Sequence, residues 1–156
     1  MPAIRVVQVS SKVQLGDALA IRRTVFVDEQ GVSEELEFDG RDREARHFLA
    51  LIEGRAVGAL RLRLLDHGRI AKIERVAVLA PERSRRVGRA LMDAVLASAC
   101  SLGARQAVLH AQVGASGFYA GFGFEPNGAA FEEDGIAHVA MRLDLADAES
   151  GAAGPP

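Results

Sequence analysis

Four arginines surround a glycine at positions 83–90, in the stretch RSRRVGRA, just before a predicted helix. The start of a helix carries the positive end of the helix dipole, so cations there are unfavourable unless an anion binds. Free N–H groups at a helix start bind phosphate, and Gly88 has no Cβ to keep an anion away from the backbone. The pattern predicts either a di- or polyphosphate site or arginines that point into water. The candidate residues are Arg85, Arg86, Val87, Gly88, Arg89 and Ala90.

Two common nucleotide motifs are missing from this stretch. A Walker A loop needs a lysine followed by serine or threonine after its second glycine, and none stands here. A Rossmann fingerprint needs G-x-G-x-x-G at the start of a helix, and Gly88-Arg89-Ala90 does not provide it. The sequence therefore disfavours nucleotide hydrolysis and dinucleotide redox chemistry.

The elements that must position this stretch follow from hydrophobic spacing. We expect a mixed α/β domain with one sheet. Residues 33–46 are rich in Glu and Asp and form either a solvated loop or one wall of a site for a cationic substrate. The strands 47–52, 56–65 and 69–79 are expected to form an antiparallel meander. The remaining strands are predicted at 4–9, 106–113, from 124 and at 136–143, with helices at 13–27, 87–102 and 116–120.

The composition limits the class of protein. The chain has 156 residues, a net charge of −2 and 49% apolar residues, which fits one globular domain without a global field toward nucleic acid or membranes. It shows no signal peptide and no apolar run near the ~20 residues that a membrane span needs. We predict a cytoplasmic protein with a domain over residues 1–143, a disordered tail over 144–156, and no metal site built from its single cysteine.

Three motifs together resemble the GNAT superfamily of acyl-CoA N-acyltransferases. Arg-x-x-Gly-x-Ala at positions 85–90 looks like its pyrophosphate loop, the strand at 73–78 precedes it, and GFYAGFGF at 117–124 resembles its Phe-Tyr-x-x-x-Gly-Phe element. The stretches RTVFVDEQ at 23–30, Glu37-Phe38-Asp39 and Asp134-Gly135-Ile136-Ala137-His138 are similar to the small bacterial ElaA-type branch. The resemblance implies the acyl-CoA N-acyltransferase fold: a single mixed, mostly antiparallel sheet flanked by helices, of the α/β (α+β) class.

The same resemblance implies an activity and its site. It implies an acetyl-CoA-dependent N-acetyltransferase, in which the backbone of Val76, Ala77 and Val78 bulges and binds the pantetheine arm. Tyr119, the only tyrosine, occupies the position of a general acid beside the cofactor sulfur. The alternative for Tyr119 is a tyrosine that packs in the core.

The general base is left open among several residues. Glu74 is the first candidate, because a carboxylate in an apolar strand is costly unless it is paired or used; the alternative is a salt bridge to Arg61, Arg63 or Lys72. His110 and His138 are further candidates, and each could equally be a structural histidine. Acidic residues on the acceptor side would attract a cationic amine; they are Glu29, Glu37, Asp39, Glu132, Glu133 and Asp134.

The acceptor is predicted to be a primary amine of a small molecule or protein, attacked directly in a ternary complex. A non-catalytic acyl-CoA-binding sensor is the alternative, and it would need neither Tyr119 nor Glu74. A nucleic-acid-binding module is disfavoured by the net charge and by the lack of exposed aromatic stripes. The sequence names neither the acyl chain length nor the oligomeric state, although an exposed strand edge in this fold allows a homodimer.

Overall fold

The computed structural model describes residues 2–145, which form a mixed sheet flanked by four α-helices. The helices are α1 (Lys12–Arg22), α2 (Glu34–Glu37), α3 (Val87–Ser101) and α4 (Ser116–Ala120). The strands are β1 (Ile4–Gln8), β2 (Arg46–Ile52), β3 (Arg55–Leu65), β4 (Ile70–Val78), β5 (Gln106–Gln112), β6 (Glu125–Pro126), β7 (Phe131–Glu133) and β8 (Ile136–Asp144). The pairing order is β1-β2-β3-β4-β5-β8-β6, with β7 on β8, which confirms the predicted fold class.

The chain divides into two compact units, and strand β4 contributes to both. The first unit contains residues up to Arg63 together with Glu74–Leu96. The second contains Leu64–Ile73 and the residues from Ala97 onward.

In the first unit, strands β1, β2 and β3 pair antiparallel. The turn between β2 and β3 consists of Glu53 and Gly54, whose φ angles of 51° and 76° are both positive. Two positive φ angles define the tight turn whose twist suits a two-residue hairpin. This hairpin agrees with the first part of the predicted meander.

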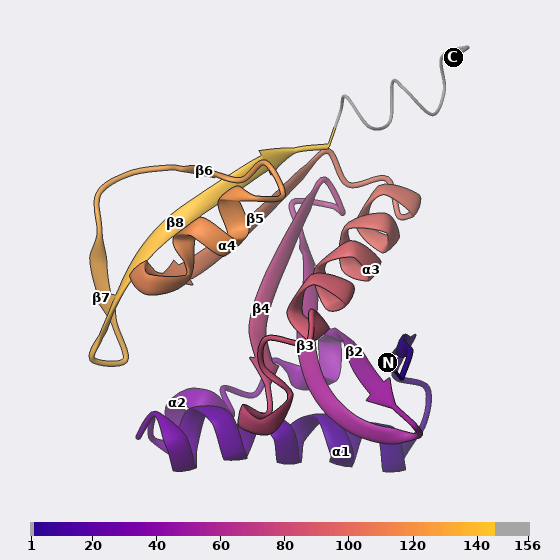
Figure 1. The fold of residues 1–156 in the computed structure, drawn as a ribbon. Helices are drawn as coiled ribbons and strands as arrows, with labels where there is room; N and C mark the ends of the chain where they lie inside the picture. Colours follow the sequence, from indigo (N-terminus) through magenta and orange to yellow (C-terminus); the bar gives the residue numbers. More distant parts are fainter. Residues whose placement is uncertain (1, 146–156) are drawn as a thin grey trace. The chain divides into compact units, whose positions relative to one another are not determined.

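The helical segment of the first unit covers its sheet (Figure 1). Helix α1 begins at Ser11, whose hydroxyl accepts a hydrogen bond from the Gln14 N–H, and it continues as a π-helix over Arg23–Glu29. The chain leaves this segment at Gly31, where φ is 76°, a conformation that glycine adopts readily. The core packs the buried side chains of the helices against those of the sheet; these are Ala18, Ile21, Val25, Leu49, Ala59 and Ala77.

Helix α3 begins close to the backbone of β3. A Cβ built at Gly58 would lie 2.9 Å from Val87 Cγ1 and 3.0 Å from Leu91 Cδ1. Only glycine leaves room for the first turns of α3 at this distance from the strand. The absence of a side chain at Gly58 therefore sets where the arginine-rich helix start can lie within this unit.

In the second unit, β5 lies between the first residues of β4 and strand β8. It pairs parallel with Ile70–Lys72 and antiparallel with all of β8. Strands β7 and β8 form a hairpin around Asp134 and Gly135, whose φ angles are 53° and 77°. Helix α4 packs near β5 after a short 3₁₀ turn (Figure 1).

The structure differs from the sequence-based expectations at three places. The helix predicted to reach Val27 becomes a π-helix after Arg22. Strand β7 was not predicted, although Asp134-Gly135 is a typical hairpin signal. Strand β8 ends at Asp144, one residue past the predicted strand, and Leu145 is buried; residues 146–156 of the predicted tail lie outside the described residues.

Candidate functional site

The loop before α3 has a backbone that few residues other than glycine adopt. Ser84 and Arg86 have φ angles of 72° and 66°, in the left-handed region. Strained backbone conformations of non-glycine residues are frequent at binding sites. A left-handed residue next to right-handed ones also points successive N–H groups toward a common point. The predicted phosphate loop thus combines left-handed backbone at Ser84 and Arg86 with basic side chains.

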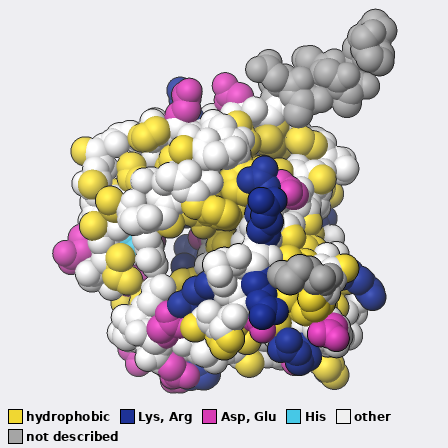
Figure 2. All heavy atoms as spheres, viewed as in Figure 1, with side chains coloured by type: hydrophobic (Ala, Val, Ile, Leu, Met, Phe, Trp, Pro, Cys, Tyr) yellow, Lys and Arg dark blue, Asp and Glu magenta, His cyan; other side chains and the backbone are white. Residues whose placement is uncertain are grey.

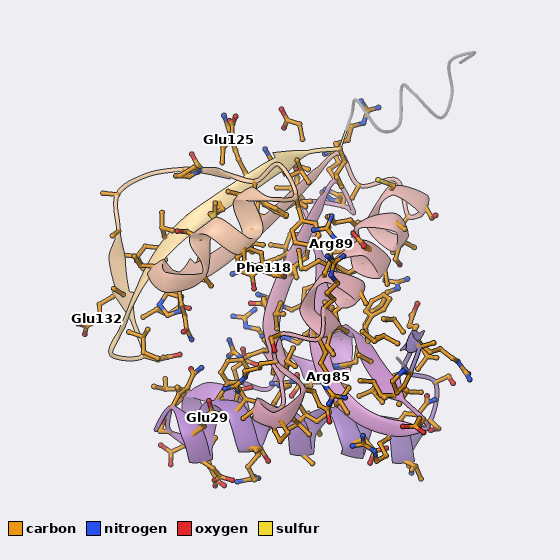
Figure 3. The ribbon with its side chains drawn as sticks, viewed as in Figure 1. Glu29, Arg85, Arg89, Phe118, Glu125 and Glu132 are labelled. Carbon is orange, nitrogen blue, oxygen red and sulfur yellow. The ribbon has the colours of Figure 1, made fainter. Side chains whose placement is uncertain are left out.

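Basic side chains accompany this backbone. Figure 3 shows Arg85 and Arg89 at the start of α3, and Figure 2 shows basic side chains gathered on the viewed face in the same area. Arg85 lies 3.5 Å from the carboxylate of Glu82, which is buried. The charge of Arg85 is therefore partly balanced within the protein.

Arg83 ties the loop to neighbouring elements. Its guanidinium donates to both carboxylate oxygens of Glu29, at 2.6 and 2.8 Å, and its Nε donates to the Val78 carbonyl at 2.9 Å. The hydrogen bond from Arg83 lowers the pKa of Glu29. Glu29, predicted for the acceptor side, is thus an ionised partner of Arg83, and the Val78 carbonyl already has a donor.

Strand β4 is interrupted at Arg75, immediately before the segment predicted to bulge. Its φ is 58°, a left-handed conformation inside a strand and the kind of residue that produces a β-bulge. The Arg75 Nε lies 3.1 Å from the Glu37 carboxylate, and its NH2 donates to the Leu36 carbonyl at 3.1 Å. The segment around α2 therefore holds the side chain of the residue at which β4 leaves its regular path.

Glu74 forms the salt bridge that the sequence left as an alternative. Arg63 donates to its two oxygens at 2.6 and 3.2 Å, and the Arg61 Nε donates to Oε1 at 3.1 Å. Two guanidinium groups stabilise the ionised carboxylate and reduce its affinity for a proton. The role of Glu74 as a base stays a prediction, and this geometry makes it a weak one.

The most buried carboxylates of the acidic segment 33–46 are paired with arginines. At these positions the segment is neither a solvated loop nor an open acidic wall. Arg22 and Arg61 are fully buried. Arg22 binds Glu37 at 2.8 Å and Asp42 at 2.6 Å, and Arg61 binds Asp39 at 2.8 Å and Asp42 at 3.0 Å. These five side chains form an ion network inside the first unit, so the negative charge of Glu37 and Asp39 is largely compensated.

The pKa values in this network follow burial and pairing. The hydrogen bond from Arg61 holds the pKa of Asp39 far below its usual range. Burial alone would raise the pKa of Asp42, but the hydrogen bond and charge of Arg22 more than offset it. Burial raises the pKa of Glu37 in spite of Arg22 and Arg75.

Tyr119 is buried on α4 in the second unit. Its ring makes edge contacts with Phe118 and Phe124, at centroid distances of 5.0 and 6.3 Å. Burial raises the pKa of Tyr119 to about 12, so the phenol keeps its proton throughout the neutral range. The side chain is thus both packed among aromatic rings and protonated, as a general acid must be.

The second unit also contains a cluster of three titratable side chains, which are His110, Glu133 and His138. His110 Nδ1 lies 3.0 Å from Glu133 Oε1, and His138 Nε2 lies 3.9 Å from the other oxygen, Oε2. Phe131 makes an edge contact with the His110 ring at 5.1 Å and stacks on His138 at 6.1 Å. The structure therefore brings two of the predicted candidates to one carboxylate.

The pairing of His110 with Glu133 was missed in the sequence. The two residues are 23 positions apart, and their contact depends on the β7–β8 hairpin. Recognising Asp134-Gly135 as a hairpin turn could have placed Phe131 and Glu133 opposite β8. Arg75 gave no such signal, because a left-handed arginine in a strand has no sequence pattern.

Within residues 2–145, no three histidine, cysteine, aspartate or glutamate side chains are grouped in a way that would hold a metal ion. None of the helices in the same range combines the length and apolar character that a membrane crossing requires.

Comparisons with known proteins agree with the motifs. Residues 9–145 match the family described as the acetyltransferase (GNAT) domain. The chain is 37% identical over 132 residues to the uncharacterized N-acetyltransferase YjcF of Bacillus subtilis, across 84% of this chain and 93% of YjcF. It is 33% identical over 138 residues to the protein ElaA of Escherichia coli, across 86% of this chain and 90% of ElaA.

Solved structures show the same relationship. The crystal structure of Escherichia coli ElaA superposes with a TM-score of 0.79 at 30% identity and covers 90% of this chain and 99% of its own. An acyl-CoA N-acyltransferase from Pseudomonas aeruginosa gives a TM-score of 0.76 at 28% identity, with the same coverage of 90% and 99%. With the family match spanning the chain from the end of β1 to Leu145, this protein belongs to the GNAT family and is an acyl-CoA-dependent N-acetyltransferase of the ElaA-like type.

Proposed function

We propose that the protein transfers an acetyl group from acetyl-CoA to a primary amine of a small molecule or protein, by direct attack in a ternary complex. The observation that carries the proposal is the start of α3, where left-handed backbone at Ser84 and Arg86 meets a cluster of arginines. A diphosphate carries the negative charge that a helix start and a group of guanidinium groups bind favourably.

The residues present fit acetyl-CoA. The N–H groups at the start of α3 would donate to the diphosphate, with positive charge from Arg85, Arg86 and Arg89. The backbone of Val76, Ala77 and Val78, beyond the left-handed residue Arg75, would hold the pantetheine arm. The thioester supplies the activated acetyl group.

The chain's own residues would manage the protons of the transfer. The amine must give up a proton before it can attack, since an ammonium ion has no lone pair. As the nitrogen–carbon bond forms and the carbon–sulfur bond breaks, the departing thiolate needs a proton. Tyr119 holds one, because its pKa of about 12 keeps it protonated, and we assign it as the donor.

Glu74 fits the basic role less well than its sequence position suggested. Both of its oxygens accept hydrogen bonds from arginine, so proton uptake there would break favourable contacts. We propose that Glu74 contributes mainly by fixing Arg61 and Arg63, and that the amine loses its proton elsewhere.

Calorimetry with acetyl-CoA tests the proposal, comparing the wild type with Gly88→Asp. An added carboxylate at the helix start should repel the diphosphate and weaken binding by at least about tenfold, or ~1.4 kcal/mol. Gly16→Asp is the matched control, because Gly16 is exposed on α1 and a Cβ there meets nothing within 4 Å. We expect its affinity to equal that of the wild type.

Turnover is then measured by mass spectrometry with a panel of primary amines and by release of free CoA thiol. Acetylated product, with binding lost only in Gly88→Asp, supports the proposed function. Tight binding without acetylation of any amine favours the acyl-CoA sensor. No binding by the wild type contradicts the assignment of the helix start.

A further inference from the structure

The contact between His110 and Glu133 is a hydrogen bond between a strand histidine and a hairpin carboxylate. His110 Nδ1 lies 3.0 Å from Glu133 Oε1. A carboxylate accepts hydrogen bonds, so it favours the tautomer in which the proton sits on Nδ1. The lone pair of the ring then lies on Nε2, the nitrogen on the far side from Glu133.

The register of the strands places this pair on one face of the sheet of the second unit. His110 is opposite Ala140 on β8, and two residues further on each strand Gln112 is opposite His138. His138 is in turn opposite Phe131 on β7, and Glu133 lies on the same face as Phe131 because the two are two residues apart. His110, Phe131, Glu133 and His138 therefore share one face.

The side chains of the two histidines differ in how far they are exposed to solvent. The side chains of His110 and Glu133 are 37% and 36% exposed, whereas that of His138 is 9% exposed. The His138 Nδ1 donates to the Ile136 carbonyl at 2.7 Å within its own hairpin, and its ring stacks on Phe131. His138 thus supports the hairpin from inside, and His110 is the histidine that solvent and a ligand can reach.

We propose that His110 is the proton acceptor for the incoming amine, with Glu133 as the residue that orients its ring. The inference rests on the proposed function and names the base that Glu74 does not readily provide. An alkylammonium N–H gives its proton to His110 Nε2, the nitrogen keeps the electron pair, and the ring becomes imidazolium. Glu133 stabilises that cation, as a carboxylate beside an imidazole does in other acyl transfers.

Glu133 has a second effect, because its carboxylate is partly exposed to solvent. Its negative charge attracts the ammonium form of the amine toward the nitrogen that will take the proton. Phe131 contacts the edge of His110 and covers the ring from one side. The three side chains together provide attraction, proton uptake and a fixed ring orientation.

Other charged groups share this face and would tune the titration of His110. In register, Lys72 on β4 and Arg142 on β8 both lie opposite Val108, two residues before His110, and Glu125 on β6 lies opposite Arg142. Helix α4, which packs near β5, contains no charged residue. The groups to consider are Glu133, His138, Lys72, Arg142 and Glu125.

Kinetics against pH test the role of His110. His110→Ala should lower kcat/KM by roughly 100-fold or more, the usual contribution of a general base, and added imidazole should restore part of the rate. Glu133→Gln should lower kcat/KM by a smaller factor than His110→Ala, because the ring keeps its lone pair but loses the carboxylate that orients it and stabilises the imidazolium. His67→Asn is the matched control, since His67 is 88% exposed on the β3–β4 turn and its φ of 57° suits asparagine.

Nitrogen NMR of the wild type gives a readout that does not depend on turnover. We expect His110 as the Nδ1–H tautomer. An Nε2–H tautomer would overturn the proposal, because Nε2 would have no lone pair to offer. A His110→Ala enzyme with an unchanged rate and pH profile would overturn it as well.

The outcomes separate this inference from the proposed function. If the wild type acetylates amines and His110→Ala does so equally well, only the role of His110 falls. If the wild type binds no acetyl-CoA or acetylates no amine, the proposed function falls and the catalytic role of His110 falls with it. Correct folding of each variant is checked by its acetyl-CoA affinity, which should equal that of the wild type.

Discussion

Tyr119 shows how a side chain's surroundings decide its chemistry. A solvated phenol has a pKa near ~10, and burial on α4 raises the pKa of Tyr119 to about 12. The raised pKa therefore keeps the proton on Tyr119 throughout the neutral range, and it also makes the buried phenol a weaker acid than a solvated one. The same burial disfavours the tyrosinate, so Tyr119 adds no negative charge to its surroundings at neutral pH.

This shift can be measured without interference, because the chain has one tyrosine and no tryptophan. The tyrosinate absorbance near ~295 nm should rise at about pH 12 in the folded protein and near ~10 in denaturant. The folded pKa lies above the unfolded one, so this group's stabilisation is complete below pH ~10 and falls by up to about 2–3 kcal/mol as the pH rises toward 12. A midpoint near 10 in the folded state would show that the ring is solvated, and Tyr119→Phe gives the baseline.

Local motifs predicted single residues better than pairs of them. The arginines near Gly88 and the tyrosine at 119 stand in short contiguous patterns, so their positions could be predicted from sequence. The partner of Glu74 was foreseen only as one of three cations, and the partner of His110 was not foreseen. Those contacts depend on strand register and on a hairpin, which short patterns do not encode.

At the scale of elements, the close packing of β3 against α3 depends on Gly58. A methyl group there would come within 3.2 Å of the Ala77 carbonyl, in addition to the side chains of Val87 and Leu91. Backbone cannot move aside as a flexible side chain can, so the helix start must shift. The position of the proposed diphosphate site is thus linked to a residue in the neighbouring strand.

Gly58→Ala should lower the unfolding free energy by about 1–3 kcal/mol, the typical cost of overpacking a core. Acetyl-CoA affinity should also fall, because the first turn of α3 moves. Gly114→Ala is the control, since a Cβ at Gly114 meets nothing within 4 Å. Thermal denaturation and calorimetry check both effects, and equal stability of the two variants would contradict the packing argument.

Most regular elements were predictable, and the irregular ones were not. Hydrophobic spacing gave α3, β5 and most of β8 nearly to the residue, because each buries one face. Arg75 within β4 and Ser84 in the loop before α3 adopt left-handed backbone although neither is a glycine. Tertiary contacts, such as those of Arg75 with the segment around α2, hold Arg75 in a conformation that its own preference disfavours.

At the scale of the whole chain, the buried ion network makes the unfolding free energy sensitive to low pH. Its members are Arg22, Glu37, Asp39, Asp42 and Arg61. The pKa of Asp39 is lowered by Arg61, so its contribution is complete above pH ~4 and is lost as the pH falls further. The raised pKa of Glu37 acts in the opposite direction, because its protonation is easier when it is buried. Asp39 and Asp42 therefore dominate the loss of stability in acid.

Asp39→Asn should lower the unfolding free energy at pH 7 by about 1.5–3 kcal/mol, the range for hydrogen bonds to a charged group. Arg61 is fully buried and would lose two of its charged contacts. At pH ~3 the gap between variant and wild type should narrow, because the Asp39 carboxylate of the unfolded wild type, with an ordinary pKa near ~3.9, takes up a proton there while that of the folded state stays ionised. Urea denaturation at both pH values checks this, with Asp17→Asn, on the exposed face of α1, as the control; an identical gap at both pH values would argue against it.

The π-helix over Arg23–Glu29 has a consequence for how chain length varies among relatives. Its wide turns, such as the bond from the Gln30 N–H to the Val25 carbonyl at 3.2 Å, take up one more residue than an α-helical turn. A relative that lacks one residue between Arg22 and Gly31 can therefore run the same course as a continuous α-helix. A one-residue gap at this place in an alignment would therefore mean that an α-helix replaces the π-helix, and that no helix is missing.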